Sequence, residues 1–299
     1  HRLDAEDCIS FVSGYLTNLT TIGHLFGPDD VIFHDRLAHN SAIQGALLSR
    51  ARRIPFPHND WQALDRLMRE ARPAFKRALI FIEGVYSMDG DIAEVPRFIE
   101  LRDRHQAILM VDEAHSLGVL GKTGGGVREH FGLNGADVDL WMGTLSKALA
   151  SCGGYIAARR EIVEYLRYPV PGFMFSVGLS APAAAAALAA LQRLAEVPDR
   201  IAALQDRASL FLACARRHGL DVGASGGTAI VPVILGDSRK CVALSRALFA
   251  RGFNVQPMLA PAVSEQGARL RFFLTSAHTQ AQIRDVVDAT AEELVRLPS

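Results

Sequence analysis

The sequence AILMVDEAH at residues 107–115 decides the fold class. Residues 107–111 are apolar without polar alternation, which is typical of a strand that helices cover on both faces of a sheet. Asp112 follows at the carboxyl end of this strand, where ligands bind in open α/β sheets. Taken alone, Asp112 is explained equally well as a helix N-cap, a metal ligand or a functional acid.

Similar apolar or β-branched runs recur through the first half of the chain. They predict strands at residues 8–12, 31–34, 78–82, 107–111, 139–142 and 154–157. Amphipathic segments lie between them, such as residues 61–71, where apolar side chains recur at i, i+3, i+4 and i+7. Asn59, with Gln62 three residues later, predicts the N-terminal cap of that helix. The alternation predicts right-handed βαβ crossovers and a doubly wound α/β domain with a mainly parallel sheet.

The pattern changes near residue 196. A long helical stretch reaches His218, and strands are expected near residues 229–235 and 270–274, with helices near 240–251 and at the end of the chain. Thr279 with Gln282 forms a capping-box pattern at the start of the closing helix. We therefore predict a large domain at residues 1–196 and a smaller α+β domain at residues 197–299.

Composition excludes several classes of protein. The chain has 299 residues, of which 49% are hydrophobic and 21% charged, as in a globular protein with a substantial core. Lys plus Arg and Asp plus Glu number 32 each, so no net charge attracts nucleic acid or an anionic membrane. No apolar run reaches the ~18 residues of a membrane span, and residues 1–7 are too polar for a signal peptide. We expect a cytoplasmic protein.

The cysteines give no sign of a metal centre. Cys8, Cys152, Cys214 and Cys241 are widely spaced and form no Cys-x-x-Cys pair. Neither a zinc site nor a disulfide framework is therefore predicted. We expect buried, reduced thiols, because a free cysteine behaves as a small hydrophobic residue.

A second group of polar residues follows another predicted strand, in the sequence GTLSK at residues 143–147. A lysine beside small residues at the end of a buried strand can be desolvated, which lowers its pKa and favours imine formation with an aldehyde. Taken alone, Lys147 is explained better as a solvated surface lysine. Together with Asp112 it predicts a pyridoxal-phosphate (PLP) enzyme, because PLP requires a lysine for its aldehyde and an acid for its pyridine nitrogen.

One motif imitates a nucleotide site. Gly121-Lys122-Thr123 resembles the end of a P-loop, but residue 116, where the first glycine of that motif would lie, is a serine. A P-loop also follows its strand directly, whereas residues 112–115 intervene here. The glycines at 124–126 are better explained as a flexible turn near the cofactor.

Six segments together resemble one family in order and spacing. They are residues 13–15 (SGY), 35–39 (DRLAH), 83–90 (EGVYSMDG), 111–116 (VDEAHS), 144–147 (TLSK) and 269–271 (RLR). The chain resembles the α-oxoamine synthases over nearly its whole length; their members include 8-amino-7-oxononanoate synthase, serine palmitoyltransferase and glycine C-acetyltransferase. The resemblance implies the fold-type I PLP transferase architecture and the decarboxylative condensation of an amino acid with an acyl thioester, carried by coenzyme A or an acyl-carrier protein.

The resemblance also assigns roles around the cofactor ring. Lys147 would be the Schiff-base lysine and would move the substrate α-proton. Asp112 would pair with the pyridine nitrogen. His115 and Ser87 would hydrogen-bond the phenolic oxygen, and His39 would stack on the ring face.

Other positions match the family's phosphate and substrate sites. Gly14 and Tyr15 open a helix whose N–H groups can meet the phosphate, and Thr144 would add a hydroxyl. Ser176 resembles the residue that reaches the phosphate of the neighbouring subunit, which implies a homodimer with shared active sites. Arg271 resembles the arginine that clamps the substrate carboxylate; the alternative is a surface arginine on the same strand face as Arg269.

The chain departs from the family pattern in two places. Family members carry a substantial portion ahead of the SGY turn, so we expect this chain to be N-terminally incomplete. Gly125 lies where the family more often has an arginine. Two rival hypotheses remain, a class I/II aminotransferase on the same fold and a non-catalytic partner subunit. Retention of Lys147, Asp112 and His115 together argues against the second.

Overall fold

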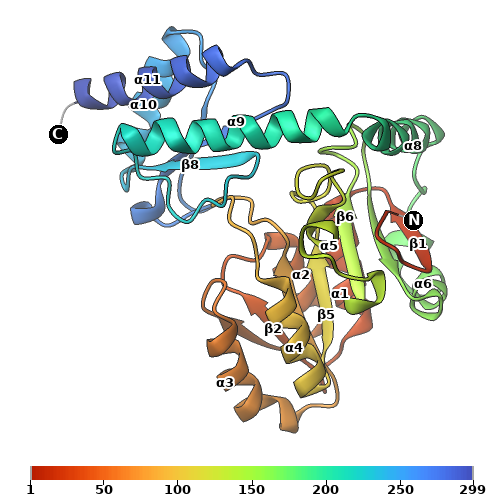
Figure 1. Cartoon of the computed structure of the whole chain (residues 1–299). Helices are drawn as coiled ribbons and strands as arrows, with labels where there is room; N and C mark the ends of the chain where they lie inside the picture. The colour runs from red at the N-terminus through yellow and green to blue at the C-terminus, as the bar shows by residue number, and fades with distance from the viewer. Residues whose placement is uncertain (1, 298–299) are drawn as a thin grey trace. The chain divides into compact units, whose positions relative to one another are not determined.

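The computed structural model describes residues 2–297, and its internal contacts divide the chain into two compact units (Figure 1). The first unit contains the chain up to Tyr86 and the segment Ala93–Pro198. The second contains Ser87–Ile92 and the chain from Asp199 onward.

The first unit is built on a seven-stranded sheet in the order β1-β7-β6-β5-β4-β2-β3. Its strands are β1 (Asp7–Phe11), β2 (Val31–Asp35), β3 (Arg52–Phe56), β4 (Ala78–Glu83), β5 (Ile108–Asp112), β6 (Leu140–Thr144) and β7 (Gly154–Ala158). From β3 to β6 all neighbouring strands are parallel. The predicted mainly parallel α/β sheet is therefore confirmed.

The edges of the sheet differ from the simple parallel pattern. Strand β7 runs antiparallel to both β6 and β1. The connection from Thr144 to Gly154 is too short for a parallel crossover, which requires a dozen residues or more. Strand β3, with the sequence RRIPF, was not predicted, because its arginines and its proline are typical of an edge position and not of a buried run.

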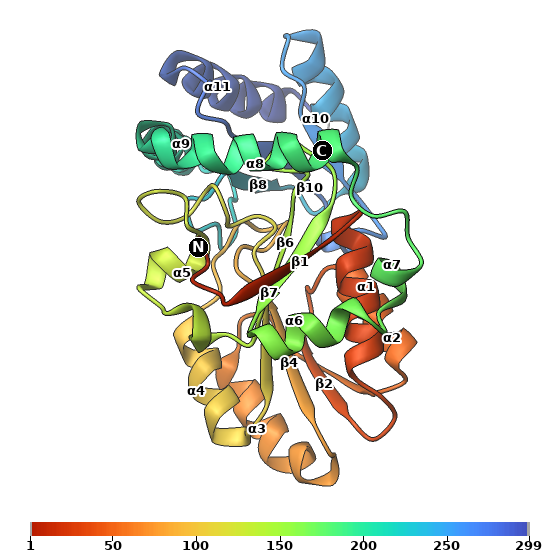
Figure 2. The same ribbon diagram turned by 90° about the vertical axis from the view of Figure 1, so that its right-hand side faces the viewer.

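Helices cover both faces of this sheet (Figure 2). They are α1 (Gly14–Leu25), α2 (Asn40–Ser49), α3 (Trp61–Ala71), α4 (Val95–His105), α5 (Gly126–Phe131), α6 (Arg160–Arg167), α7 (Pro171–Met174) and α8 (Ala181–Glu196), with 3-10 turns at Arg72–Ala74 and Gly135–Asp137. Helices α1, α2 and α6 pack on one face, and α3, α4 and α5 lie on the other (Figure 2). The helices thus leave the carboxyl ends of the parallel strands as the place where polar side chains gather.

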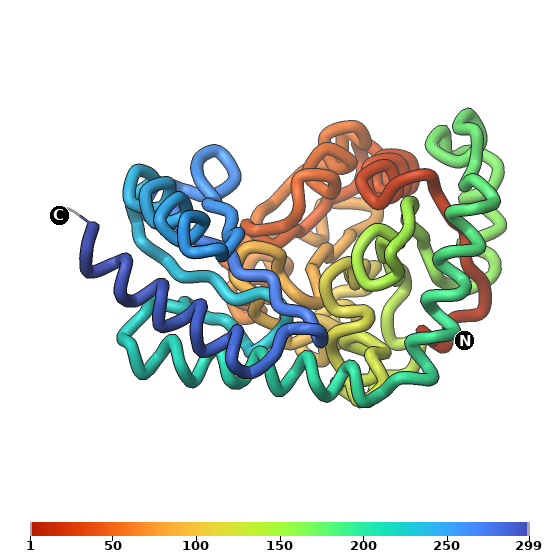
Figure 3. Tube along the Cα trace, turned by 90° about the horizontal axis from the view of Figure 1, so that it is seen from above, coloured from red at the N-terminus to blue at the C-terminus, as the bar shows by residue number. Residues whose placement is uncertain are grey.

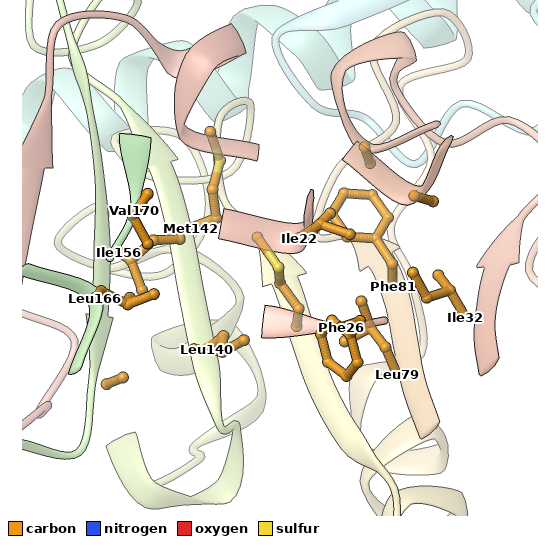
Figure 4. Close-up of a cluster of buried hydrophobic side chains, with 14 of the residues drawn as sticks. Ile22, Phe26, Ile32, Leu79, Phe81, Leu140, Met142, Ile156, Leu166 and Val170 are labelled. Carbon is orange, nitrogen blue, oxygen red and sulfur yellow. The ribbon is translucent and has the colours of Figure 1, made fainter. Parts of the chain in front are cut away.

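The apolar core between α1, α2, α6 and the sheet is shown in Figure 4. Ile22 and Phe26 from the α1 segment face Leu79 and Phe81 on β4, and Leu140 and Met142 on β6 continue the same layer toward Ile156, Leu166 and Val170. These side chains are almost fully buried. Burial on both faces explains why the strands have no polar alternation in sequence.

One predicted cap is wrong by one residue. Asp60, not Asn59, caps α3, and its carboxylate accepts a hydrogen bond from Ala63 N at 2.7 Å. Asn59 instead adopts a positive φ of 52° and donates its backbone N–H to Asp35 at 2.8 Å. Asparagine tolerates this left-handed conformation better than most residues, so it forms the turn and leaves the cap to the acid.

The second unit has a three-stranded antiparallel sheet in the order β8-β10-β9. Its elements are α9 (Pro198–Arg217), β8 (Ile230–Ile234), α10 (Ser238–Ala250), β9 (Gln256–Met258), a 3-10 turn at Glu265–Gly267, β10 (Arg269–Phe273) and α11 (Gln280–Arg296). Figure 3 follows this part of the chain from α9, in blue-green, to α11, in blue. The capping box of Thr279 and Gln282 at the start of α11 is confirmed.

The segment Ser87–Ile92 belongs to this unit through polar contacts. Arg269 donates to Asp89 at 2.6 Å and to the Met88 carbonyl at 3.1 Å. The hydroxyl of Thr228 donates to the Gly90 carbonyl at 3.0 Å. These bonds join it to the second unit although Tyr86 and Ala93 on either side of it belong to the first.

The thiols are only partly as predicted. Cys214 and Cys241 are buried, whereas Cys8 and Cys152 are exposed. Cys8 points outward from the edge strand β1, and Cys152 lies in the loop before β7. Within residues 2–297, no group of histidine, cysteine and acidic side chains is arranged to hold a metal ion, and no helix is long and apolar enough to cross a bilayer.

Candidate active site

A cavity of ≈ 310 Å³ lies at the carboxyl ends of the parallel strands in the first unit. It is lined by Ser13, Gly14, Tyr15, Asn18, His39, Ser41, Glu83, Asp112, Ala114, His115, Met142, Thr144, Ser146 and Lys147. Parallel strands end at one edge of a sheet, so segments distant in sequence converge there. The cavity brings together Gly14, Tyr15, His39, Asp112, His115, Thr144 and Lys147 from the predicted set.

Asp112 ends β5 and is buried at 4% exposure. Its Oδ1 accepts a hydrogen bond from Ala114 N at 2.9 Å, and its Oδ2 accepts one from Asn18 Nδ2 at 2.9 Å. The helix-cap alternative is excluded, because the next helix along the chain, α5, begins only at Gly126. The carboxylate is therefore fixed in orientation, and each oxygen keeps a lone pair for a further donor.

Glu83 is a site residue that the sequence analysis missed. It ends β4 as the direct neighbour of Asp112 in the strand register, and it is buried. Its Oε1 accepts the backbone N–H of His39 at 2.6 Å. Burial, and next the charge of Asp112, raise the pKa of Glu83 well above its usual value. The raised pKa favours the protonated, neutral form of Glu83 beside Asp112.

His39 is the N-cap residue of α2 and is accessible from the cavity. Its Nδ1 lies 2.7 Å from the Ser41 hydroxyl and accepts the Ser41 backbone N–H at 3.3 Å. Tyr15 approaches the imidazole edge-on, with 6.3 Å between ring centroids. Desolvation, and next the positive charge of Lys147, lower the pKa of His39, while Asp112 opposes them. A neutral imidazole at neutral pH follows.

The N-terminus of α1 forms the other wall. Its first N–H groups, on Gly14 and Tyr15, precede the first helical bond, from Thr17 N to the Ser13 carbonyl at 3.0 Å. A Cβ at Gly14 would lie 2.8 Å from Thr144 Oγ1, so glycine permits the close approach of α1 to β6. Hydroxyls of Thr144 and Ser146 lie 2.8 Å apart beside this helix start. The arrangement is a site for an anion such as a phosphate.

Lys147 lies in the turn that follows β6 and lines the same cavity as Asp112 and His39. Lys147 is exposed, so the predicted desolvation of this lysine is wrong for the chain as described. The reason is local, since Lys147 lies in a turn after β6 where residues 146–148 are all exposed. Access to the cavity is what a lysine that receives an aldehyde requires.

The donor set fits PLP. The cavity holds an amine for the aldehyde, a buried carboxylate for the pyridine nitrogen and an imidazole beside them. The start of α1 and the Thr144 hydroxyl offer donors for the phosphate. In addition, Asn18 Oδ1 is a buried acceptor in the cavity wall without a protein partner among the described residues. The residues present therefore match the chemical groups of the cofactor.

Ser87 and Arg271, two further predicted site residues, belong to the second unit. Arg271, on β10, donates from Nη1 to the carbonyl of Ser87 at 2.8 Å, and its guanidinium lies 4.5 Å from the centre of the Phe273 ring. Its Nε is buried and has no hydrogen-bond partner among the described residues. Arg269 is committed to Asp89 instead. Of the two arginines, Arg271 therefore keeps the greater donor capacity for a ligand.

Ser176 does not line the cavity. It follows α7, and its hydroxyl donates to the Phe173 carbonyl at 3.3 Å. The neighbouring side chains of Phe175 and Val177 are exposed at 85% and 101%. The role predicted for Ser176 involves a second subunit and stays a prediction.

The chain is similar to known proteins in both sequence and fold. The family Aminotransferase class I and II matches residues 1–289. The chain is 40% identical to 8-amino-7-oxononanoate synthase of Fervidobacterium nodosum, over 95% of this chain and 72% of the relative. It is 43% identical to the enzyme of that name from Geobacter sulfurreducens, over 96% and 73%. Serine palmitoyltransferase from S. paucimobilis, solved with bound PLP and myriocin, superposes with a TM-score of 0.93 at 28% identity, over 99% of this chain and 75% of that one.

Proposed function

The chain belongs to the α-oxoamine synthases, PLP-dependent enzymes within the class I and II aminotransferase family, and we propose that it joins an amino acid to an acyl thioester with loss of CO2. The observation that carries the proposal is the convergence of Lys147, Asp112 and His39 on one cavity beside the N-terminus of α1. A non-catalytic partner subunit would have no use for that set. The acyl donor is a coenzyme A or carrier-protein thioester.

The predicted site residues would hold different groups of the cofactor. Lys147 would bind the aldehyde, and Asp112 would bind the protonated pyridine nitrogen. Gly14, Tyr15 and Thr144 would hold the phosphate, with Ser176 of a second copy reaching the same group in a homodimer. His115 and Ser87 would bind the phenolic oxygen, and His39 would lie against the ring. When bound, PLP supplies an electron sink for the negative charge that develops at Cα of the amino acid.

The protein contributes proton transfer and electrostatics. The Lys147 amine would take the α-proton from the substrate and return it to the product. Burial, and next the charge of the neighbouring Asp112, raise the pKa of Glu83 and favour its neutral form. Two hydrogen bonds, from Asn18 and Ala114, prevent Asp112 from rotating away from its partner. The negative charge is therefore preorganised before any substrate arrives.

Arg271 would bind the carboxylate of the amino acid. A guanidinium offers paired donors that match a carboxylate, and the buried Nε of Arg271 is a donor without a hydrogen-bond partner among the described residues. Fixing the carboxylate also fixes the direction of the Cα–H bond, which must be perpendicular to the plane of the cofactor ring for the proton to be removed. Orientation is thus the expected contribution of Arg271 to rate.

The test begins with the visible absorption of the purified protein mixed with PLP. A band that requires Lys147, and is absent in Lys147→Ala, supports the cofactor assignment. Glycine, alanine and serine are then added one at a time to find the amino acid that shifts the band. Release of CO2 that depends on an acyl thioester supports condensation. A keto acid formed together with an aminated second substrate would instead identify an aminotransferase, and no band at all would favour the partner-subunit hypothesis.

A further inference from the structure

We propose that Ser41 and Asn18 are positioning residues that form a hydrogen-bond relay from Asp112 to His39 and hold the His39 imidazole in its Nε2–H tautomer. The tautomer is a property of this chain itself. Its use in catalysis rests on the proposed function.

The relay consists of three consecutive bonds. Asn18 Nδ2 donates to Asp112 Oδ2 at 2.9 Å and to Ser41 Oγ at 3.0 Å. Ser41 Oγ in turn lies 2.7 Å from His39 Nδ1. Asn18 and Ser41 are each 1% exposed, and Asp112 is 4% exposed. Water therefore has little access to the two bonds of Asn18, whereas the bond to His39 is part-buried and lies at the cavity.

The direction of each bond follows from counting hydrogens. A carboxylate only accepts, so Asn18 must present its NH2 group to Asp112 and not its oxygen. The second hydrogen of that NH2 group points to Ser41 Oγ, which accepts it. The single hydroxyl hydrogen of Ser41 is then available for His39 Nδ1. The bonds thus diverge from the Asn18 amide, to Asp112 on one side and through Ser41 to His39 on the other, where Nδ1 is the last acceptor.

A second donor reaches the same nitrogen. As the N-cap group of α2, His39 Nδ1 also accepts the backbone N–H of Ser41 at 3.3 Å. A proton on Nδ1 would face both this N–H and the Ser41 hydroxyl, and it would remove the cap of the helix. The neutral ring therefore carries its hydrogen on Nε2.

The charged groups around His39 agree with a neutral ring. Asp112 on β5 favours protonation, Lys147 after β6 opposes it, and Glu83 on β4 accepts only the backbone N–H. Tyr15 on α1 contributes a ring edge. Desolvation adds to the effect of Lys147 and lowers the pKa of His39. The relay acts in the same direction, since protonation of Nδ1 would disrupt it.

The consequence is a coupling between two groups of the site. One Asn18 amide holds both the acid proposed for the pyridine nitrogen and the serine that orients the imidazole. His39 would then present a neutral ring with a single N–H donor to a bound cofactor and substrate. Loss of either Asn18 or Ser41 should therefore change both the tautomer and the pKa of His39.

The experiment is NMR of protein labelled with 15N-histidine, recorded from pH 5 to pH 9 before and after addition of PLP. The His39 signals are assigned by their loss in His39→Gln. In wild type we expect an unprotonated Nδ1 and a protonated Nε2 through neutral pH, with a pKa below the usual 6.5. In Ser41→Ala and in Asn18→Ala we expect a mixture of tautomers and a pKa that moves toward 6.5.

The matched control is Ser49→Ala. Ser49 is buried in the same helix, α2, but its hydroxyl donates to the Ala46 carbonyl at 2.8 Å and takes no part in the relay. The Ser49→Ala variant should leave the His39 signals unchanged, and Ser41→Thr, which retains the hydroxyl, should keep the wild-type tautomer.

A double variant tests whether Asn18 and Ser41 act together. Because Asn18 and Ser41 belong to one chain of hydrogen bonds, the variant with both Asn18→Ala and Ser41→Ala should shift the pKa of His39 no further than either single variant does.

The proposal is overturned if wild-type His39 carries a proton on Nδ1 at neutral pH, a result that needs no variant to fold. It is also overturned if the shifts in Ser41→Ala and Asn18→Ala simply add, or if Ser49→Ala shifts the signals equally. The measurement without PLP tests the relay alone. Failure of PLP to give a lysine-dependent band would refute the proposed function and leave the tautomer assignment standing.

Discussion

Glu83 and Asp112 are direct neighbours in the parallel register of β4 and β5, and their carboxyl groups end adjacent buried strands. Two negative charges on adjacent buried strand ends repel each other, and this repulsion raises the pKa of the carboxyl group on which it acts. Glu83 is that group, because its pKa is raised well above its usual value by burial and by Asp112. The neutral form of Glu83 is therefore favoured beside Asp112.

Replacing Glu83 by glutamine should preserve the site. Glutamine is neutral at every pH and still accepts the His39 N–H, so we expect PLP binding within about threefold of wild type, a ΔΔG under ~0.7 kcal/mol. Glu83→Ala leaves that N–H without its acceptor and should cost about 1–3 kcal/mol of stability. Denaturant unfolding and PLP titration of the two variants provide the measurement. A greater loss of PLP affinity in the glutamine variant than in the alanine variant would contradict a neutral Glu83.

Glu113 predicts how stability depends on pH. It is fully buried, accepts the Val127 N–H at 3.1 Å and contacts the Ser116 hydroxyl. Burial raises the pKa of Glu113 to about 7 from 4.5. The folded state therefore holds a proton that the unfolded state releases, and the stability this provides is complete below pH 4.5 and lost as the pH rises through 7. The loss should be about 3 kcal/mol.

The measurement is denaturant unfolding of wild type and Glu113→Gln at pH 5 and pH 8. Only the difference between the two proteins is interpreted, because Glu83 titrates in the same direction. We expect wild type to lose about 2–3 kcal/mol more than the variant between these two pH values. Parallel pH profiles would mean that Glu113 is ionised throughout.

Asp112→Asn isolates the charge of the acid. The amide has nearly the same shape, but it cannot stabilise a protonated pyridine nitrogen, so we expect exchange of the substrate α-proton to fall by about 100-fold or more. Exchange is followed by NMR of the amino acid in deuterated buffer with PLP present. Asp65→Asn is the control, since Asp65 is a buried acid of the same unit that pairs with His105 at 2.8 Å, away from the cavity lining. Equal losses in both variants would point to a folding defect.

Gly14→Ala tests the close approach of α1 to β6. The added Cβ would lie 2.8 Å from Thr144 Oγ1, so the helix start or Thr144 must shift. We expect PLP affinity to fall by about tenfold, or ~1.4 kcal/mol, with the absorption band still formed. Gly27→Ala is the matched control, because no heavy atom lies within 4 Å of a Cβ built there. An unchanged PLP affinity in Gly14→Ala would mean that the phosphate does not bind at the start of α1 beside Thr144.

The sequence was informative where burial dominates. A strand covered on both faces leaves an apolar run without alternation, so β2, β4, β5 and β6 were predicted near their observed positions. Edge strands lack that signal, and β3 was missed for this reason. The antiparallel direction of β7 follows from the short connection between β6 and β7, whose length was not used in the sequence analysis.

The site divides in the same way. Asp112 was found because an acid follows an apolar strand, and Glu83 follows β4 by the same pattern, so it could have been predicted too. Asn18 and Ser41 lie in helices as ordinary polar residues, and nothing local marks them. Their importance depends on the packing of α1 against α2 over the end of β5, which is tertiary information.

Arg271→Lys is the sharpest test of the substrate carboxylate site. Lysine keeps the charge but not the paired, planar donors, so a guanidinium that grips a carboxylate with two bonds is poorly replaced. We expect KM for the amino acid to rise by about 10- to 100-fold, equivalent to ~1.4–2.7 kcal/mol, while the PLP band without substrate is unchanged. Arg269→Lys provides the comparison, because Arg269 is tied to Asp89 at 2.6 Å and should affect the stability of the second unit instead. If Arg269→Lys raises KM and Arg271→Lys does not, the two arginines exchange roles, and the structural interpretation of Arg269 is wrong.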